Sequence, residues 1–332
     1  MLDLALTNLL SPAVLCFALG LLACRLHSDL RLPEPVQAGL SAYLMLSIGL
    51  RGGAELAHTP LAELGAPVVA ALAMGCAIPL WAYAGLRRLA GLGVADAAAL
   101  AAHYGSVSAV TFAAVTAMLD RQGLAYEGHA VALLAVMEIP AIVVGIGLAR
   151  LAQGTQAVAV GGGCAALGGV GPFGSLGGVV ASKSVLLLLG GLVIGAAAGP
   201  AGLRPVQPFF GVLFPGVLCL FLLELGRLTG ERLEAFGRVG GRLLAFALLA
   251  PVLHAALGML LAAAAGLSEG GAVVFATLCA SSSYIAAPAA VRAALPEANP
   301  SLYLTCSLGI TFPFNMLVGL PLYQAMAGWM YG

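Results

Sequence analysis

Charged residues are scarce in this chain of 332 residues, and their scarcity excludes several classes of protein. Asp, Glu, Lys and Arg make up 8% of the residues, and the 14 basic and 14 acidic side chains leave no net charge. A nucleic-acid-binding surface needs clustered Lys and Arg, which this composition does not supply. We therefore expect no DNA or RNA partner.

Motifs of enzymes and metalloproteins are also lacking. The seven cysteines lie scattered in apolar segments without CxxC or Cys/His spacing, which is typical of small packing residues. His103 and His254 have no second ligand at metal spacing, so we expect structural roles for both. No hydrolase, zinc-protease, Walker-type or Rossmann motif occurs in a supporting context. The sequence predicts no enzymatic activity, no cofactor and no metal site.

Hydrophobic residues, in contrast, are abundant. They make up 61% of the chain and raise its mean hydropathy to +1.04, whereas soluble domains contain roughly 45–50% apolar residues. Ten apolar runs approach the ~20 residues that cross a bilayer. The sequence therefore predicts an all-α membrane protein with ten transmembrane helices. The runs lie near residues 9–25, 36–50, 66–89, 95–118, 129–149, 183–199, 207–227, 241–265, 269–292 and 302–328.

The two halves of the chain share short patterns at a nearly constant offset. Matching pairs are Ser11-Pro-Ala-Val-Leu15 with Ser182-Lys-Ser-Val-Leu186, Gly105-Ser-Val-Ser108 with Ala280-Ser-Ser-Ser283, and Ile139-Pro140 with Phe312-Pro313. We predict two repeats of five spans, 1–150 and 183–332, joined by a flexible glycine-rich linker, 151–182. Five is an odd number, so the second repeat is inverted in the membrane. Inverted repeats are typical of secondary transporters, whose substrate sites lie where the repeats meet.

Basic residues predict the orientation, because they are enriched in cytoplasmic loops. All but three of the 14 basic residues fall in loops on one side of the predicted spans. The exceptions are Arg51, Arg121 and Arg204. We therefore expect both termini outside, the linker in the cytoplasm, and the protein in a bacterial cytoplasmic (inner) membrane.

Polar clusters interrupt two of the predicted spans at equivalent repeat positions. Glycine, hydroxyl side chains and proline are typical of a helix that breaks where its free backbone groups face a cavity. The exposed N–H groups and the positive end of the helix dipole attract a small anion. An alternative for any one hydroxyl is a bond to the carbonyl a turn earlier, with no further role. The predicted substrate-binding residues are Gly105, Ser106, Ser108, Thr111, Ser281, Ser282 and Ser283, with Pro288 following the second cluster.

Two carboxylates fall inside apolar runs. Glu138, two residues before Pro140, can supply oxygen to a hard cation such as sodium or exchange a proton. The alternative is a protonated or hydrogen-bonded packing residue. Glu224 lies near a predicted cytoplasmic end beside Arg227, where we expect an ordinary ion pair.

The motifs of both halves resemble the sodium-dependent bicarbonate transporter family, the high-affinity bicarbonate permeases of the cyanobacterial type. The last motif is the most specific in its order and spacing. The residues that carry the resemblance are Ile48-Gly-Leu-Arg-Gly-Gly53, Tyr104-Gly-Ser-Val-Ser108 with Thr111, Tyr126-Glu127, Met137-Glu-Ile-Pro140, Ala250-Pro-Val-Leu-His254, Ala280-Ser-Ser-Ser-Tyr-Ile-Ala-Ala-Pro288, and Asn299-Pro-Ser-Leu-Tyr303 with Ser307 and Pro313.

The resemblance implies a sodium-coupled bicarbonate importer of the elevator type. A core of spans three to five and eight to ten would move against a gate formed by the others, and such carriers commonly form homotrimers. Bicarbonate would lie between the two interruptions, with sodium beside it at Glu138, Ser108 and Ser283. The family also has a PII-like regulatory partner that acts on a charged cytoplasmic loop, whereas the linker here is uncharged.

Three positions depart from the family pattern. Tyr284 and Glu138 both stand where the family has aspartate, and Ser108-Ala-Val-Thr111 replaces Ser-Gly-Ser-Thr. Loss of a carboxylate removes a hard oxygen ligand, which leaves coupling to protons or another cation open. Two other functions also stay open. One is a carrier of the same fold for another small carboxylate or organic anion, and the other is a transport-deficient membrane sensor or scaffold.

Overall fold

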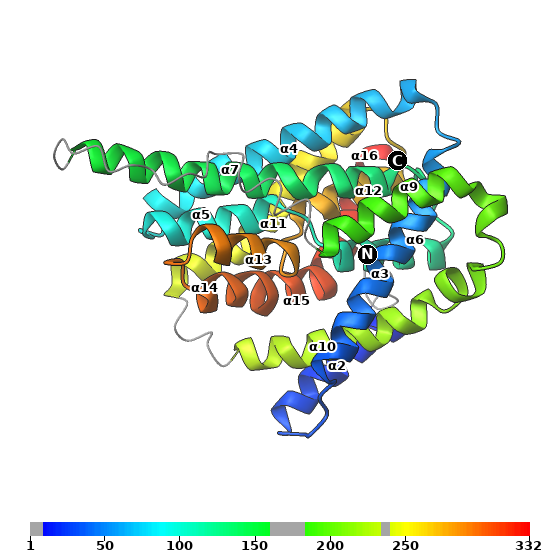
Figure 1. Cartoon of the computed structure of the whole chain (residues 1–332), viewed down its shortest axis with the longest axis horizontal. Coiled ribbons are helices and arrows are strands. Elements are labelled where there is room, and N and C mark those ends of the chain that lie inside the picture. The colour runs from blue at the N-terminus through cyan, green and yellow to red at the C-terminus, as the bar shows by residue number, and fades with distance from the viewer. Residues whose placement is uncertain (1–8, 160–182, 234–239) are drawn as a thin grey trace.

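The computed structural model describes residues 9–159, 183–233 and 240–332, and these residues form helices without any strand (Figure 1). In chain order the elements are α2 (Pro12–Arg25), α3 (Glu34–Leu56), α4 (Leu61–Arg88), α5 (Val94–Gly105), α6 (Ala109–Gln122), α7 (Ala130–Ala159), α9 (Lys183–Leu203), η1 (Pro208–Val212), α10 (Phe214–Leu233), α11 (Gly240–Ala264), α12 (Glu269–Ala280), α13 (Ala286–Ala294), α14 (Pro300–Leu304), η3 (Thr305–Thr311), α15 (Phe312–Phe314), η4 (Asn315–Gly319) and α16 (Leu320–Tyr331).

Six helical segments in the described part of the chain are long and apolar enough to cross a membrane. The other predicted spans also fall on helices, namely α2, α3, α10 and the α12–α13 pair, but these are shorter or more polar. The all-helical fold is therefore confirmed, and the count of ten spans stays a prediction. The six segments are Ala62–Arg88, Val94–Gln122, Ala130–Ala152, Val185–Leu203, Gly240–Ala264 and Pro300–Tyr331.

Two helix pairs, α2 with α10 and α3 with α9, pack with their backbones in contact, and each pair takes one helix from each half of the chain. Figure 1 shows α2 beside α10 at one edge of the molecule. A Cβ atom on Gly53 would lie 2.1 Å from the Leu192 carbonyl oxygen, and one on Gly226 would lie 2.0 Å from that of Phe17. Real Cβ atoms do not approach backbone so closely, so only glycine permits these contacts.

Both predicted interruptions are confirmed. α5 ends at Gly105, Ser106 is extended with a ψ of 158°, and Ser108 begins α6 as its N-cap. In the second half, α12 ends at Ala280, Ser281 is extended with a ψ of 167°, and α13 starts at Ala286. The serines favour the breaks because their hydroxyls compete with the backbone for hydrogen bonds.

Two helices differ from the sequence-based expectation. α7 continues to Ala159, past the predicted end of its span near residue 149, because its alanines, leucine and glutamines favour a helix even where apolar residues become fewer. The start of the predicted linker is thus helical, and its remainder, 160–182, lies outside the described residues. The last span contains π-helical turns at Thr305–Thr311 and Asn315–Gly319, on either side of Pro313.

Candidate functional site

The two interruptions cross each other and are joined by hydrogen bonds. The Ser283 amide donates to the His103 carbonyl at 2.8 Å, and the Ser108 amide donates to Ser281 Oγ at 3.0 Å. Each bond links one half of the chain to the other. The crossing therefore brings together the two hydroxyl clusters that the sequence predicted to share one site.

Two helix N-termini meet at this crossing, those of α6 and α13. First-turn amides point out of the N-terminal end of a helix, where the dipole is positive. Ser108 Oγ accepts the Thr111 amide and Ser283 Oγ accepts the Ala287 amide, both at 3.1 Å. The first amides of α6, those of Ala109 and Val110, have no acceptor within the helix. This arrangement suits a small anion without a buried basic side chain.

Tyr284 places a phenol at the crossing, 3.1 Å from Ser108 Oγ. Because Ser108 Oγ already accepts the Thr111 amide, its hydrogen donates to the phenol oxygen, which leaves the phenol hydrogen available to a ligand. Its ring packs edge-on against Phe312, with the centroids 5.2 Å apart. From the sequence, Tyr284 stands out as a missing carboxylate rather than as a donor, although its position directly after three serines is a signal for the site.

The predicted hydroxyl residues are all at most 4% exposed, so a ligand among them would be shielded from water. Ser281 Oγ donates to the Leu278 carbonyl, one turn earlier, at 2.8 Å, as expected for a hydroxyl with a purely local role. It also accepts the Ser108 amide of the other half, so its role is not local alone. Ser282 Oγ makes only a long contact of 3.4 Å to the Ser307 carbonyl. Among these hydroxyls, that of Ser282 is therefore held weakly.

Gly105 lies at the end of α5, against α4 and α7. A Cβ atom at this position would lie 2.6 Å from Pro79 Cδ and 2.8 Å from Ala141 Cβ. Its small size therefore lets the broken end of α5 fit between the neighbouring helices. The predicted contact of Gly105 with a substrate stays a prediction.

Glu138 is 5% exposed, and its backbone carbonyl accepts Ser106 Oγ at 3.2 Å. Within residues 9–159, 183–233 and 240–332, its carboxylate forms no hydrogen bond and no ion pair, and no hydrogen bond joins it to Ser108 or Ser283. A buried carboxylate without partners is costly. A cation site and a protonated packing residue both fit a carboxylate without a partner among these residues, and the role of Glu138 stays a prediction.

The final helical segment satisfies carbonyls near the crossing with buried polar side chains. Asn315 Nδ2 donates to the Ala280 carbonyl at 3.0 Å, and Tyr323 donates to Asn315 Oδ1 at 2.7 Å. Thr311 Oγ1 donates to the Ala247 carbonyl at 2.7 Å and accepts the Tyr104 hydroxyl at 2.6 Å. Thr311 and Asn315 are not among the residues predicted from the sequence, although two polar residues one turn apart in an apolar run are a signal.

Other predicted polar residues have structural partners. Trp81 Nε1 donates to His254 Nε2 at 3.0 Å, and the His103 ring lies 4.4 Å from that of Tyr303. The Glu224–Arg227 pair is present at 2.6 Å. Where the structure describes the chain, no group of three His, Cys, Asp or Glu side chains is arranged to hold a metal ion, and the six described cysteines are free. Cys164 lies outside these residues.

These features define a membrane transporter, since apolar helices surround a buried polar crossing to which each half of the chain gives an interrupted helix. The sequence matches the Na⁺-dependent bicarbonate transporter superfamily over residues 12–328. The chain belongs to this family and is a multi-pass membrane protein. The resemblance seen in the sequence motifs is thereby confirmed across both halves. A comparison with curated proteins found no match.

Proposed function

We propose that the protein imports bicarbonate, or a similar small monovalent anion, together with sodium. The supporting observation is the crossing, where the N-termini of α6 and α13 meet and the Glu138 backbone carbonyl accepts Ser106 Oγ of the first interruption. Among the described residues, the Glu138 carboxylate has no ion pair. The anion binds at the amides and hydroxyls of the crossing, and the cation binds at Glu138 with oxygens of Ser108 and Ser283. Pairing opposite charges lowers the cost of carrying either ion through hydrocarbon.

The proposed anion site keeps the residues expected from the sequence and adds one. The phenol of Tyr284 supplies a neutral donor, which suits an anion better than the carboxylate that the family has at this position. The full set is Gly105, Ser106, Ser108, Thr111, Ser281, Ser282, Ser283 and Tyr284.

Ten spans in two inverted repeats form the proposed architecture. Reciprocal contacts support it: Asp96 at the start of α5 accepts the Asn299 amide at 2.8 Å, and Glu127 in the loop before α7 accepts the Ser268 amide at 2.6 Å. Each bond joins the start of one broken helix to the loop before the last helix of the other half. Inverted repeats related by a two-fold axis produce such pairs.

The proposed transport cycle is an elevator movement in a homotrimer. The glycine-packed helices α2, α3, α9 and α10 form the static gate, and the broken helices move with their neighbours as the core. We place both termini outside an inner membrane, on the basis of the basic residues. The linker, most of which lies outside the described residues, is the proposed site of action of a PII-like regulator.

Uptake by purified protein in proteoliposomes tests the proposed function. Labelled bicarbonate should accumulate when sodium is higher outside than inside, and accumulation should stop when sodium is equal on both sides. Protein-free liposomes control for diffusion of carbon dioxide. Uptake that ignores the sodium gradient would remove sodium coupling, and uptake driven by a pH gradient would assign the coupling to protons.

Competition distinguishes the alternatives. Formate, acetate and nitrate in excess should reduce bicarbonate uptake only weakly, whereas a carrier of another small carboxylate would be inhibited by its own substrate. A sensor or scaffold would be stabilised against heat by bicarbonate and show no flux.

Ser282→Ala is expected to reduce uptake about threefold, the effect of one lost hydrogen bond to the anion. Its stability should barely change, because among the described residues the Ser282 hydroxyl loses just the long bond to the Ser307 carbonyl. Initial rates and melting temperatures of the parent and variant measure both effects. Ser301→Ala, an exposed serine on α14, is the matched control, and equal uptake by the two variants would remove Ser282 from the site.

A further inference from the structure

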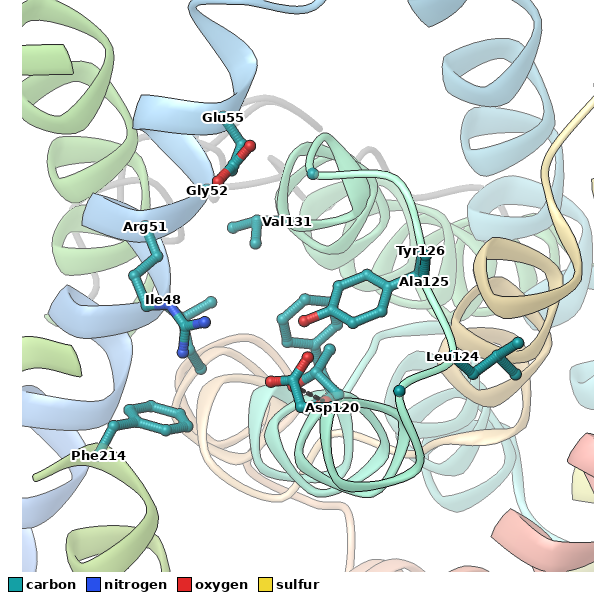
Figure 2. Close-up of a pocket in the computed structure, with 14 residues that line it drawn as sticks. Ile48, Arg51, Gly52, Glu55, Asp120, Leu124, Ala125, Tyr126, Val131 and Phe214 are labelled. Atoms are coloured by element: carbon teal, nitrogen blue, oxygen red, sulfur yellow. Dashed lines mark hydrogen bonds between the residues drawn. The ribbon is translucent and has the colours of Figure 1, made fainter. Parts of the chain in front are cut away.

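A cavity of about 420 Å³ lies between α3 and α6, with the loop before α7 on one side (Figure 2). It is open to the surroundings rather than enclosed, because Arg51, Glu55 and Asp120 on its walls are exposed. It is distinct from the buried crossing. Its lining residues are Ile48, Arg51, Gly52, Glu55, Phe112, Thr116, Asp120, Gly123, Leu124, Ala125, Tyr126, Gly128, Val131 and Phe214.

The cavity leads toward the crossing along α6. Phe112 and Thr116 line it, and Ser108 precedes Phe112 by four residues, about one helical turn on the same face. Phe112 is 3% exposed. Along the helix, Phe112 therefore lies between the cavity and Ser108 at the crossing.

Arg51 points into the cavity, and Figure 2 shows it facing Asp120 across the space. Arg51 forms no ion pair with any residue that the structure describes, and its guanidinium carbon lies 6.0 Å from the centroid of the Phe214 ring. The face of a guanidinium can stack on an aromatic ring while its edge binds oxygen atoms. The donors of Arg51 are therefore free for an anion.

Two further polar groups shape the cavity. Burial and the nearby Asp120 carboxylate, which also accepts a hydrogen bond from the phenol, raise the pKa of Tyr126 to about 12, so this phenol keeps its proton at neutral pH. Asp120 faces Arg51 across the space, and Glu55 lies one turn further along α3 (Figure 2). Their negative charge opposes the accumulation of multivalent anions more strongly than that of monovalent ones. The cavity thus combines Arg51, which has no ion pair among the described residues, with one protonated phenol and two carboxylates that limit the anionic charge it accepts.

We propose that this cavity is an outer vestibule in which Arg51 captures the substrate anion before it passes Phe112 to the crossing. The inference rests on the proposed function and adds where the anion first binds. The ligand is a planar monovalent oxoanion, because a guanidinium can donate to two of its oxygens at once. Arg51 is thus a binding residue that the hydroxyl clusters did not reveal.

The test measures the bicarbonate KM for uptake into proteoliposomes at saturating sodium. Arg51→Gln should raise the KM about fivefold and leave the maximal rate nearly unchanged, because capture is weakened but translocation is not. Arg51→Lys should recover part of the affinity. Asp120→Asn should lower the KM about twofold, because it removes negative charge from the same cavity.

Arg121→Gln is the matched control, since it removes one exposed positive charge next to Asp120 but outside the cavity lining. If the parent protein transports bicarbonate, an unchanged KM in Arg51→Gln would refute anion capture by Arg51 in the cavity and leave the proposed function standing. An equal rise in Arg121→Gln would also overturn it, by assigning the effect to general surface charge. A parent protein without bicarbonate uptake would refute the proposed function itself. Arg51 is exposed and forms no ion pair with the described part of the chain, so the variants should fold, and size-exclusion profiles verify this.

Discussion

Glu138→Gln is expected to lower sodium-stimulated bicarbonate uptake about tenfold or more, because a neutral amide is a much weaker ligand than a carboxylate for a hard cation. The shape of the side chain is kept, and no hydrogen bond to the carboxylate within the described residues is lost. The loss should therefore appear in transport rather than in folding. Uptake rates against sodium concentration, for parent and variant at equal protein density, measure it.

Two companion variants sharpen this test. Glu138→Asp restores a carboxylate and the residue type of the family, so it should recover much of the sodium response. Glu34→Gln removes an exposed carboxylate at the start of α3 and should leave uptake unchanged. A full sodium response in Glu138→Gln would refute the cation role. If uptake by the parent responds to pH instead of sodium, loss of uptake in Glu138→Gln would make Glu138 a proton carrier.

Gly53→Ala is expected to lower the melting temperature by about 5 °C or more, because forcing extra volume into a packed interface costs about 1–3 kcal/mol and sometimes more. The new Cβ atom would lie 2.1 Å from the Leu192 carbonyl oxygen and 2.8 Å from the Ala196 amide nitrogen. Both atoms belong to the α9 backbone, so the strain cannot be relieved by a side-chain rotation. α3 and α9 would have to separate.

Gly39→Ala is the matched control for this prediction. Gly39 lies on the same helix, and a Cβ atom there meets nothing within 4 Å. Alanine favours a helix over glycine by roughly 1 kcal/mol, so this variant should be unchanged or slightly more stable. Equal melting temperatures for the two variants in detergent would contradict the close contact of α3 with α9.

The interruptions could be predicted from the sequence because their causes are local. Glycine and several hydroxyls inside an apolar run weaken a continuous helix at that point, and Ser106 and Ser281 do leave the helix as expected. The repeat made the meeting of the two clusters predictable as well. The bonds that join them could not be predicted, since the Ser283 amide and the His103 carbonyl meet only through the tertiary fold.

Other features could not be predicted from the sequence, because they depend on tertiary contacts. The chain contains 45 glycines, and only the geometry reveals that Gly53 and Gly226 touch a neighbouring backbone while Gly39 does not. Arg51 entered the sequence analysis as an orientation marker, because nothing local to the sequence shows which residues face it. The sequence shows that Tyr284 replaces the aspartate of the family, but only the structure shows that its phenol accepts a hydrogen bond from Ser108 Oγ.

The glycine contacts also bear on how the chain assembles during synthesis. α2 and α3 leave the ribosome first, yet the helices that fit against them, α10 and α9, belong to the second half. Until α10 and α9 are synthesised, the glycine-containing faces of α2 and α3 are exposed to lipid or a chaperone. The nascent first half therefore cannot complete its helix packing alone. If the two halves were made as separate polypeptides, each would need the other in the same bilayer to reach its native fold.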